Sequence, residues 1–169
     1  MKKKIVILGS TGSIGTTSLK IIEKKRKLFN IEILSANKNY NKIYRQIIKF
    51  KPRYFIVTNN KIFLKIRKKF KNKKTKILNN YKQISFSKKK IDITIASIPG
   101  IAGLEPTINF TKKSKKILLA NKESIICGWQ IISKLGKRHK TKIIPIDSEH
   151  FSIMKLLENH KVNEIEKIY

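Results

Sequence analysis

KIVILGSTGSIG, residues 4–15, runs four apolar residues directly into a loop that has a glycine at every third position. The apolar run predicts a buried strand, and the residues after the loop predict the start of a helix. A helix start directs unpaired backbone N–H groups and the positive end of its dipole towards the loop, where they favour an anion. Gly9, Gly12 and Gly15 suit a tight turn and a close backbone approach. The stretch predicts a nucleotide phosphate site, and an ordinary strand-to-helix turn is the alternative.

Beyond this stretch, strand-like and helix-like segments alternate along the chain. The further strands are expected at residues 31–36, 53–57, 75–78, 91–97, 115–120 and 142–146. Helical spacing covers residues 13–29, 40–50 and 61–70, and longer segments at 103–113 and 123–140 separate the last three strands. This alternation predicts an α/β fold with a Rossmann-like, doubly wound parallel sheet. Such sheets bind ligands beyond the carboxyl ends of their strands.

Length and composition favour one globular domain, with room for the beginning of another. The 169 residues are 40% hydrophobic, which is enough for a real core. The single cysteine, Cys127, excludes an internal disulfide and is expected to be a small buried residue. No apolar run is long enough for a membrane span, and the start of the chain lacks a signal-peptide core, so we expect a cytoplasmic protein without a membrane partner.

The charge of the chain is strongly positive. Lys and Arg number 40 against 10 Asp and Glu, a formal net charge of +30. Such a balance is typical of nucleic-acid-binding proteins. However, the lysines are spread over the whole chain, and isoleucine and asparagine, whose codons are also rich in A and T, are abundant too. Compositional drift therefore explains the charge better, and no specific nucleic-acid partner is expected.

The end of the second expected strand carries the next functional signal. An acidic residue there would accept the ribose 2′-hydroxyl of NADH. This chain has Ser35 and the segment 37–39 (Asn-Lys-Asn) instead, which offer donors and a positive charge. That set suits a 2′-phosphate and predicts NADPH over NADH. The alternative is that Lys38 is one surface lysine among many.

The stretch PIDSEH, residues 145–150, is the second informative motif. Asp147 and Glu149 flank Ser148 directly after an apolar strand. In an extended segment, residues two apart point to the same side, so both carboxylates would converge on one cation. Oxygen ligands of this kind suit Mg²⁺ or Mn²⁺. The alternative is a helix N-cap made by Asp147 or Ser148, and spacing alone does not choose between the two.

Four motifs together, ILGSTGSIG, AGLEPT, LLANKES and PIDSEH, resemble the 1-deoxy-D-xylulose 5-phosphate reductoisomerase family in sequence and in order. The resemblance implies an NADPH-binding Rossmann-like domain at residues 1–146 and the beginning of a catalytic domain at 147–169. Family members are more than twice as long, so we expect a fragment or a truncated chain.

The resemblance also implies roles for individual residues. The expected cofactor contacts are Thr11, Gly12, Ser13 and Ile14 at the pyrophosphate, Asn37, Lys38 and Asn39 at the 2′-phosphate, and Asn121 and Glu123. The expected substrate and catalytic residues are Lys122, Ser148 and Glu149, and the expected metal ligands are Asp147 and Glu149, with a third carboxylate beyond residue 169. Glycine is usual in the family at position 37, and asparagine is a tolerable substitute there.

The family's reaction rearranges 1-deoxy-D-xylulose 5-phosphate and reduces the product with NADPH to 2-C-methyl-D-erythritol 4-phosphate. A cation held by Asp147 and Glu149 would chelate the oxygens of this phosphorylated sugar. The full-length enzyme is expected to be a homodimer, and the 169-residue chain alone is expected to be inactive. Two other readings stay open: another NADP-dependent Rossmann dehydrogenase, and a basic nucleic-acid-binding relic without enzyme activity.

Overall fold

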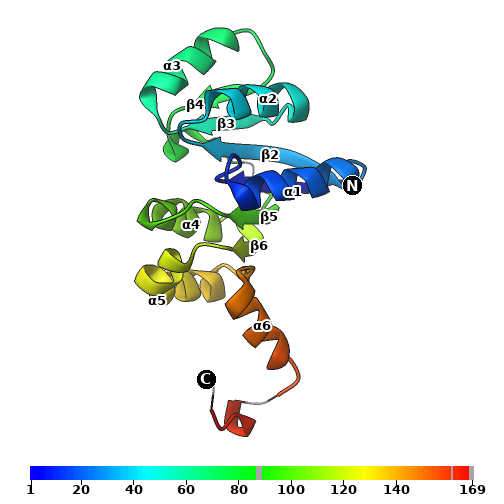
Figure 1. The fold of residues 1–169 in the computed structure, drawn as a ribbon, viewed down its shortest axis with the longest axis vertical. Coiled ribbons are helices and arrows are strands. Elements are labelled where there is room, and N and C mark those ends of the chain that lie inside the picture. The colour runs from blue at the N-terminus through cyan, green and yellow to red at the C-terminus, as the bar shows by residue number, and fades with distance from the viewer. Residues whose placement is uncertain (87–88, 161, 168–169) are drawn as a thin grey trace.

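A computed structural model describes residues 1–86, 89–160 and 162–167, which build one parallel sheet with helices packed against it (Figure 1). The strands are β1 Lys3–Leu8, β2 Phe29–Ala36, β3 Tyr54–Val57, β4 Lys76–Leu78, β5 Ile91–Ala96, β6 Ser114–Leu119 and β7 Lys142–Pro145. The helices are α1 Ser13–Lys24, α2 Tyr40–Phe50, α3 Asn60–Lys69, α4 Leu104–Thr111, α5 Lys122–Arg138 and α6 Ser148–Leu156. Short 3₁₀ turns are η1 Tyr81–Gln83, η2 Ile101–Gly103 and η3 Val162–Glu164. The predicted α/β alternation is confirmed.

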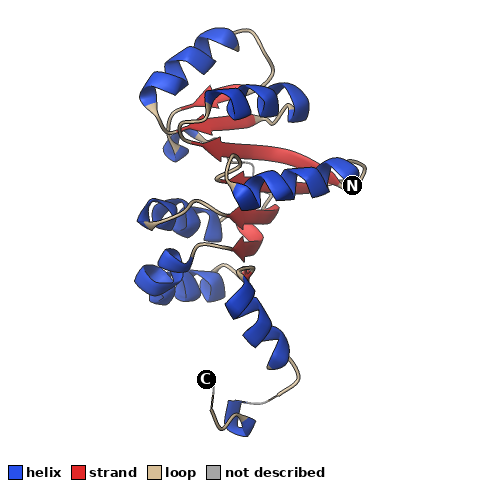
Figure 2. Cartoon of the chain, in the orientation of Figure 1, coloured by secondary structure: helices blue, strands red, loops and turns tan. Residues whose placement is uncertain are grey.

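The strand order of the sheet is β4-β3-β2-β1-β5-β6-β7, and every neighbouring pair is parallel. The chain therefore moves outward from β1 to β4 and then returns to place β5 on the other side of β1. This reversal is a topological switch point, where the loops after two adjacent strands leave the sheet in opposite directions and form a ligand crevice. Figure 2 shows the sheet as a stack of strands with helices beside it, and because every neighbouring pair is parallel, the carboxyl ends of the strands share one edge.

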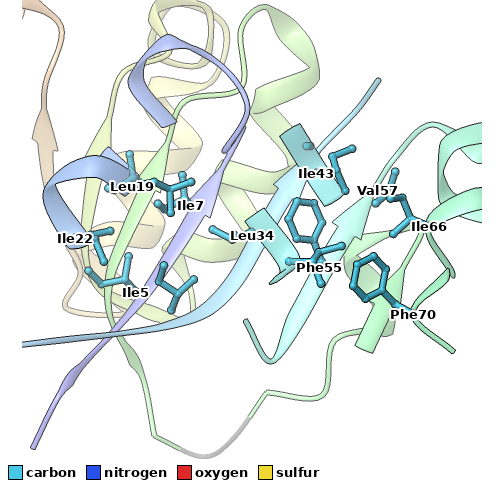
Figure 3. Packing of buried hydrophobic residues seen from close by; sticks show 14 of the residues in the cluster. Ile5, Ile7, Leu19, Ile22, Leu34, Ile43, Phe55, Val57, Ile66 and Phe70 are labelled. Atoms are coloured by element: carbon cyan, nitrogen blue, oxygen red, sulfur yellow. The ribbon is translucent and has the colours of Figure 1, made fainter. Parts of the chain in front are cut away.

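Both faces of the sheet are buried, as its parallel strands require. Side chains alternate along β1, so that Ile5 and Ile7 enter one hydrophobic cluster and Val6 and Leu8 enter another. The first cluster packs against α1, α2 and α3 (Figure 3), and its helix members include Leu19, Ile22, Ile43 and Ile66. The second cluster contains Phe110 of α4. The two clusters fix β1, and with it the glycine loop, in the centre of the sheet.

The first helix is shorter than the sequence predicts. The helical pattern over residues 13–29 is broken after Lys24, where the N–H of Lys25 bonds to the carbonyls of Ile21 and Ile22. Phe29 begins β2 and pairs with Lys3 of β1. Its apolar side chain fits the helical spacing by coincidence, because a half-buried strand residue needs the same hydrophobicity.

The longest helix, α5, corrects the prediction that Cys127 is buried, because this cysteine is exposed. The buried residues of α5 form a narrow stripe at i, i+4 spacing, Ser124, Gly128, Ile132 and Gly136, and Cys127 lies beside it. A Cβ added at Gly128 would collide with a leucine side chain of α4, so small residues bring the two helices close together. None of the helices in the described part of the chain is long and apolar enough to cross a membrane.

Candidate functional site

Two glycines of the first loop are required by the packing of the chain itself. Gly9 has φ +84°, and a Cβ at this position would lie 2.6 Å from the carbonyl oxygen of Ser97 in the loop after β5. A Cβ at Gly15 would collide with the carbonyl oxygen of Gly9 and lie 2.6 Å from the Cα of Ser10. All of these neighbours are backbone atoms, which cannot swing away. Gly9 and Gly15 therefore let the loop, α1 and the strand β5 approach one another at the switch point.

Gly12 is different, because the chain leaves room for a side chain there. It is the N-cap of α1 with φ −74°, and an added Cβ would be 3.4 Å from the carbonyl oxygen of Gly9, an ordinary contact. The α1 N-terminus has no side-chain cap and no acidic residue in its first turn, and both Ser13 and Ile14 are exposed. Uncapped N–H groups and open space at a helix N-terminus fit an anion such as a phosphate.

The loop after β5 is held in place by Asn121, the N-cap of α5. The Asn121 side chain is 3% exposed, and its Oδ1 accepts a hydrogen bond from the Ser124 N–H at 2.7 Å. Its Nδ2 donates to the carbonyl oxygens of Ile98 and Gly100, the latter at 2.9 Å. Both amide protons are thus used within the chain. Asn121 fixes the loop after β5 against the start of α5 on one side of the crevice.

At the end of β2, the structure corrects the role predicted for Ser35. Ser35 is 1% exposed, and its Oγ accepts hydrogen bonds from the Tyr81 hydroxyl at 3.0 Å and from the Gly9 N–H at 3.2 Å. It supports the glycine loop from beneath and does not face a ligand. The residues of the segment 37–39 are exposed beyond the strand, and the Asn39 Oδ1 caps α2 by accepting from the N–H at position 42 at 3.0 Å.

Burial gives Tyr81 an unusual titration. Burial raises the pKa of Tyr81 from 10.0 to about 12, against a lowering by its hydrogen bond with Ser35. Because the folded pKa lies above the unfolded one, the stability from this group is fully present below about pH 10 and is lost as the pH rises through about 12.

We expect tyrosinate absorbance to show a late titration near pH 12. This step should disappear in Tyr81→Phe and persist in the control Tyr44→Phe. Wild-type protein that shows no absorbance change above about pH 11 would contradict this result.

At the end of β7, Asp147 is the N-cap of α6. Its Oδ1 accepts from the His150 N–H at 3.1 Å and is 2.6 Å from the His150 Nδ1, whereas its Oδ2 is buried without a hydrogen-bond partner. Burial raises the pKa of Asp147, but the contacts with His150 outweigh it and lower the pKa below the ordinary value. The segment 147–149 is therefore not extended as the same-side argument assumed, since α6 begins at Ser148. The capping alternative is confirmed for one oxygen of Asp147.

Glu149, in the first turn of α6, lies against Lys122, the first residue of α5. The Lys122 Nζ and the Glu149 Oε1 are 2.7 Å apart, and the two side chains are 49% and 64% exposed. This contact raises the pKa of Lys122 and lowers the pKa of Glu149. The structure thus brings two of the predicted substrate and metal residues together. Ser148 and Glu123 are both exposed next to them.

The carboxylates at this edge fit part of a metal site. Within residues 1–86, 89–160 and 162–167, no group of three or more His, Cys, Asp or Glu is arranged to hold a metal ion. The buried, unpartnered Oδ2 of Asp147 is nevertheless an acceptor of the type that Mg²⁺ and Mn²⁺ prefer, and the Glu149 carboxylate follows it by two residues. Two carboxylates of this kind need further ligands for a stable site.

Comparison with known proteins identifies the family of the chain. The family model described as 1-deoxy-D-xylulose 5-phosphate reductoisomerase matches residues 5–128. The chain belongs to this reductoisomerase family. The reductoisomerase of Pelagibacter ubique is 49% identical over 170 residues, which cover 99% of this chain and 44% of that relative.

Solved reductoisomerase structures share the fold. A DOX-P reductoisomerase structure with fosmidomycin and magnesium has a TM-score of 0.83 and 29% identity, covering 98% of this chain and 44% of the other. Another, in complex with NADPH, fosmidomycin and magnesium, has a TM-score of 0.80 and 32% identity, covering 88% and 37%. The chain thus spans less than half the length of the reductoisomerases it matches.

Two residues beside the glycine loop could not be recognised from the sequence. Gln46 of α2 is 7% exposed, accepts from the Ser10 Oγ at 2.7 Å and donates to the Ser10 carbonyl oxygen at 2.9 Å. Lys42, one turn earlier, donates from its Nζ to the Thr11 carbonyl oxygen at 3.1 Å. A polar residue on the buried face of an amphipathic helix was the signal that could have revealed Gln46.

Proposed function

We propose that this chain is the NADPH-binding part of a 1-deoxy-D-xylulose 5-phosphate reductoisomerase. Residues 1–146 would form the cofactor domain and residues 147–169 the beginning of the catalytic domain. Two observations support this division: β7, the last strand of the sheet, ends at Pro145, and the helix α6 that follows it contains no buried residue. The whole enzyme would convert 1-deoxy-D-xylulose 5-phosphate to 2-C-methyl-D-erythritol 4-phosphate.

The observation that carries the proposal is the uncapped α1 N-terminus at the switch point of the sheet. The pyrophosphate of NADPH would lie on the backbone of Thr11, Gly12, Ser13 and Ile14. Its 2′-phosphate would lie at the segment 37–39, where Lys38 supplies a charge and no carboxylate repels it. Bound NADPH supplies a hydride, and the chain contributes the position of the cofactor and the electrostatics around it.

At the other side of the crevice, we propose that Asp147 and Glu149 hold Mg²⁺ or Mn²⁺ and that Lys122 and Ser148 contact the phosphorylated sugar. The buried Oδ2 of Asp147 without a partner supports the metal role. The exposed Lys122 ammonium pairs with Glu149, and its remaining protons would donate to a substrate oxygen. The same proposal includes cofactor contacts of Glu123 and of Asn121, and the contact of Asn121 would be made by its backbone because its side-chain amide is used within the chain. A homodimer of the full-length enzyme, the lack of a specific nucleic-acid partner and a cytoplasmic location remain predictions of the sequence.

The cofactor preference tests this proposal directly. We expect the chain to bind NADPH at least about tenfold more tightly than NADH, because a charge-assisted contact to the 2′-phosphate contributes on the order of 1.5–3 kcal/mol. Lys38→Asp should reverse the order, since the new carboxylate repels the 2′-phosphate and accepts a ribose hydroxyl. Fluorescence titrations of both cofactors with both proteins provide the measurement.

The matched control is Lys134→Asp, which makes the same change of charge far along α5, more than three turns from its N-terminus. It should leave the preference for NADPH unchanged, because the chain's overall charge is not what selects the cofactor. Equal affinities of the wild-type chain for NADPH and NADH would overturn the proposed cofactor.

A further inference from the structure

The buried amide of Gln46 joins α2 to the glycine loop. Its Oε1 accepts from the Ser10 Oγ at 2.7 Å and its Nε2 donates to the Ser10 carbonyl oxygen at 2.9 Å. Both bonds lie in the interior, since Ser10 is 0% and Gln46 7% exposed. Hydrogen bonds made away from water, with both partners satisfied, hold a fixed geometry better than surface contacts do.

Gln46 stands on a helix face that otherwise serves the hydrophobic core. The buried residues of α2 are Ile43, Gln46 and Ile47, and both isoleucines enter the cluster beneath α1, α2 and α3. An apolar residue at position 46 would suit the hydrophobic neighbours of this face, but it would remove both bonds to the buried Ser10 hydroxyl and carbonyl oxygen. Packing therefore does not account for a glutamine here, whereas its two bonds to the glycine loop do.

The same helix carries the residues proposed for the 2′-phosphate at its start. Asn39 is the N-cap of α2, and Lys38 directly precedes it. Ser10 directly precedes Thr11 and Gly12 of the proposed pyrophosphate site. A shift of α2 relative to the loop would thus change the distance between the two phosphate sites. The exposed Lys42 adds a second, weaker link from α2 to the Thr11 carbonyl oxygen.

We propose that Gln46 is a positioning residue that holds α2 in a fixed place relative to the glycine loop. The 2′-phosphate and pyrophosphate sites are then preorganised together, and NADPH is selected over NADH. The inference rests on the proposed function. NADPH must contact both sites at once, whereas NADH needs only the pyrophosphate site. A looser contact between α2 and the glycine loop therefore lowers the affinity for NADPH more than the affinity for NADH.

The test is the ratio of NADPH to NADH affinity in Gln46→Met, which keeps the volume of the side chain and removes both hydrogen bonds. We expect this ratio to fall at least about fivefold, while NADH affinity falls by less than about threefold. In a Lys38→Met background, which lacks the charged contact to the 2′-phosphate, Gln46→Met should lower the ratio by a clearly smaller factor than in the wild type.

Thr141→Val is the matched structural control. The buried Thr141 hydroxyl shares its proton between the carbonyl oxygens of Thr111 and Ser114, at 2.7 and 2.8 Å, in the half of the sheet away from α2. Its loss should lower the urea midpoint and leave the cofactor ratio unchanged. If Gln46→Met does not fold, Ser10→Ala decides instead, because it removes only the bond from the Ser10 Oγ and should lower the ratio in the same direction.

Each outcome separates the inference from the proposed function. A Gln46→Met or Ser10→Ala protein that keeps the wild-type ratio would overturn the inference and leave the NADPH proposal intact. A wild-type chain that does not prefer NADPH would overturn the proposed function and the inference together. A changed urea midpoint with an unchanged ratio would show that Gln46 serves stability alone.

Discussion

Gly12→Ala is expected to remove most NADPH binding while leaving the stability of the chain nearly unchanged. The backbone at Gly12 has φ −74°, which alanine adopts freely, and the added Cβ would be 3.4 Å from the carbonyl oxygen of Gly9. The apo protein therefore accommodates the methyl group. A bound pyrophosphate needs the same space next to the α1 N–H groups, so we expect affinity to fall by about 30-fold or more. Isothermal titration with NADPH and urea unfolding measure the two effects.

Gly15→Ala is the control for Gly12→Ala, because a loss of stability is expected at position 15 and not at position 12. Its Cβ would collide with the carbonyl oxygen of Gly9 and the Cα of Ser10, so the backbone itself must move. We expect this variant to lose about 2–4 kcal/mol of unfolding free energy together with cofactor binding. Gly12→Ala protein that binds NADPH as tightly as the wild type would show that no phosphate approaches Gly12. A large loss of stability in Gly12→Ala would show that this glycine serves the fold.

The contrast between these glycines also indicates what the sequence could predict. The order of apolar strand, glycine loop and helix is local, so this order and the α/β alternation could be predicted from a few neighbouring residues, whereas the phosphate role of the loop stays a prediction. The sequence could not distinguish the three glycines. The atoms that make Gly9 necessary come from Ser97, which is remote in sequence and is brought beside it by the strand order.

Ser35 and Gln46 also show that the sequence alone does not reveal which partner a polar side chain has. Ser35 is predicted from its place near the end of the second strand to face a 2′-phosphate, but Tyr81, 46 residues later, donates a hydrogen bond to its hydroxyl beneath the loop. Gln46 was passed over because it lies within a helix with no ligand motif, and its partner Ser10 is 36 residues away. Burial of a polar side chain becomes informative only when the fold shows which partner satisfies it.

The motif at residues 147–149 was ambiguous for a chemical reason. Aspartate and serine are good N-caps, and aspartate is also a good ligand for divalent metals, so the same letters fit both roles. In the structure the two carboxylate oxygens of Asp147 have different surroundings. Oδ1 caps α6, whereas Oδ2 is buried without a hydrogen-bond partner. One residue can therefore serve both roles at once, which spacing alone cannot reveal.

Asp147→Asn separates these two roles. Asparagine caps helices as well as aspartate does, so the α6 cap and the stability of the chain should be retained to within about 0.5 kcal/mol. The substitution removes the negative charge and turns one oxygen into an amide, so Mn²⁺ binding should be lost. We expect reductoisomerase activity to fall by about a thousandfold or more in a protein that joins residues 1–169 to the remaining part of the Pelagibacter ubique relative, because the metal would stabilise charge during the rearrangement.

Glu158→Gln is the matched control, since it also replaces an acidic residue near α6. The ion pair of Glu158 is with Lys155, at 2.5 Å, and not with Lys122. It should leave turnover and Mn²⁺ binding unchanged.

Glu149→Gln should reduce both turnover and Mn²⁺ binding. It should also free the Lys122 ammonium from its ion pair, which raises the pKa of Lys122 in the wild type. The 169-residue chain should bind Mn²⁺ only weakly, because two carboxylates leave most of the coordination to water. Metal-dependent turnover that survives in Asp147→Asn would show that Asp147 only caps α6, and full activity of the 169-residue chain alone would show that no further carboxylate is needed.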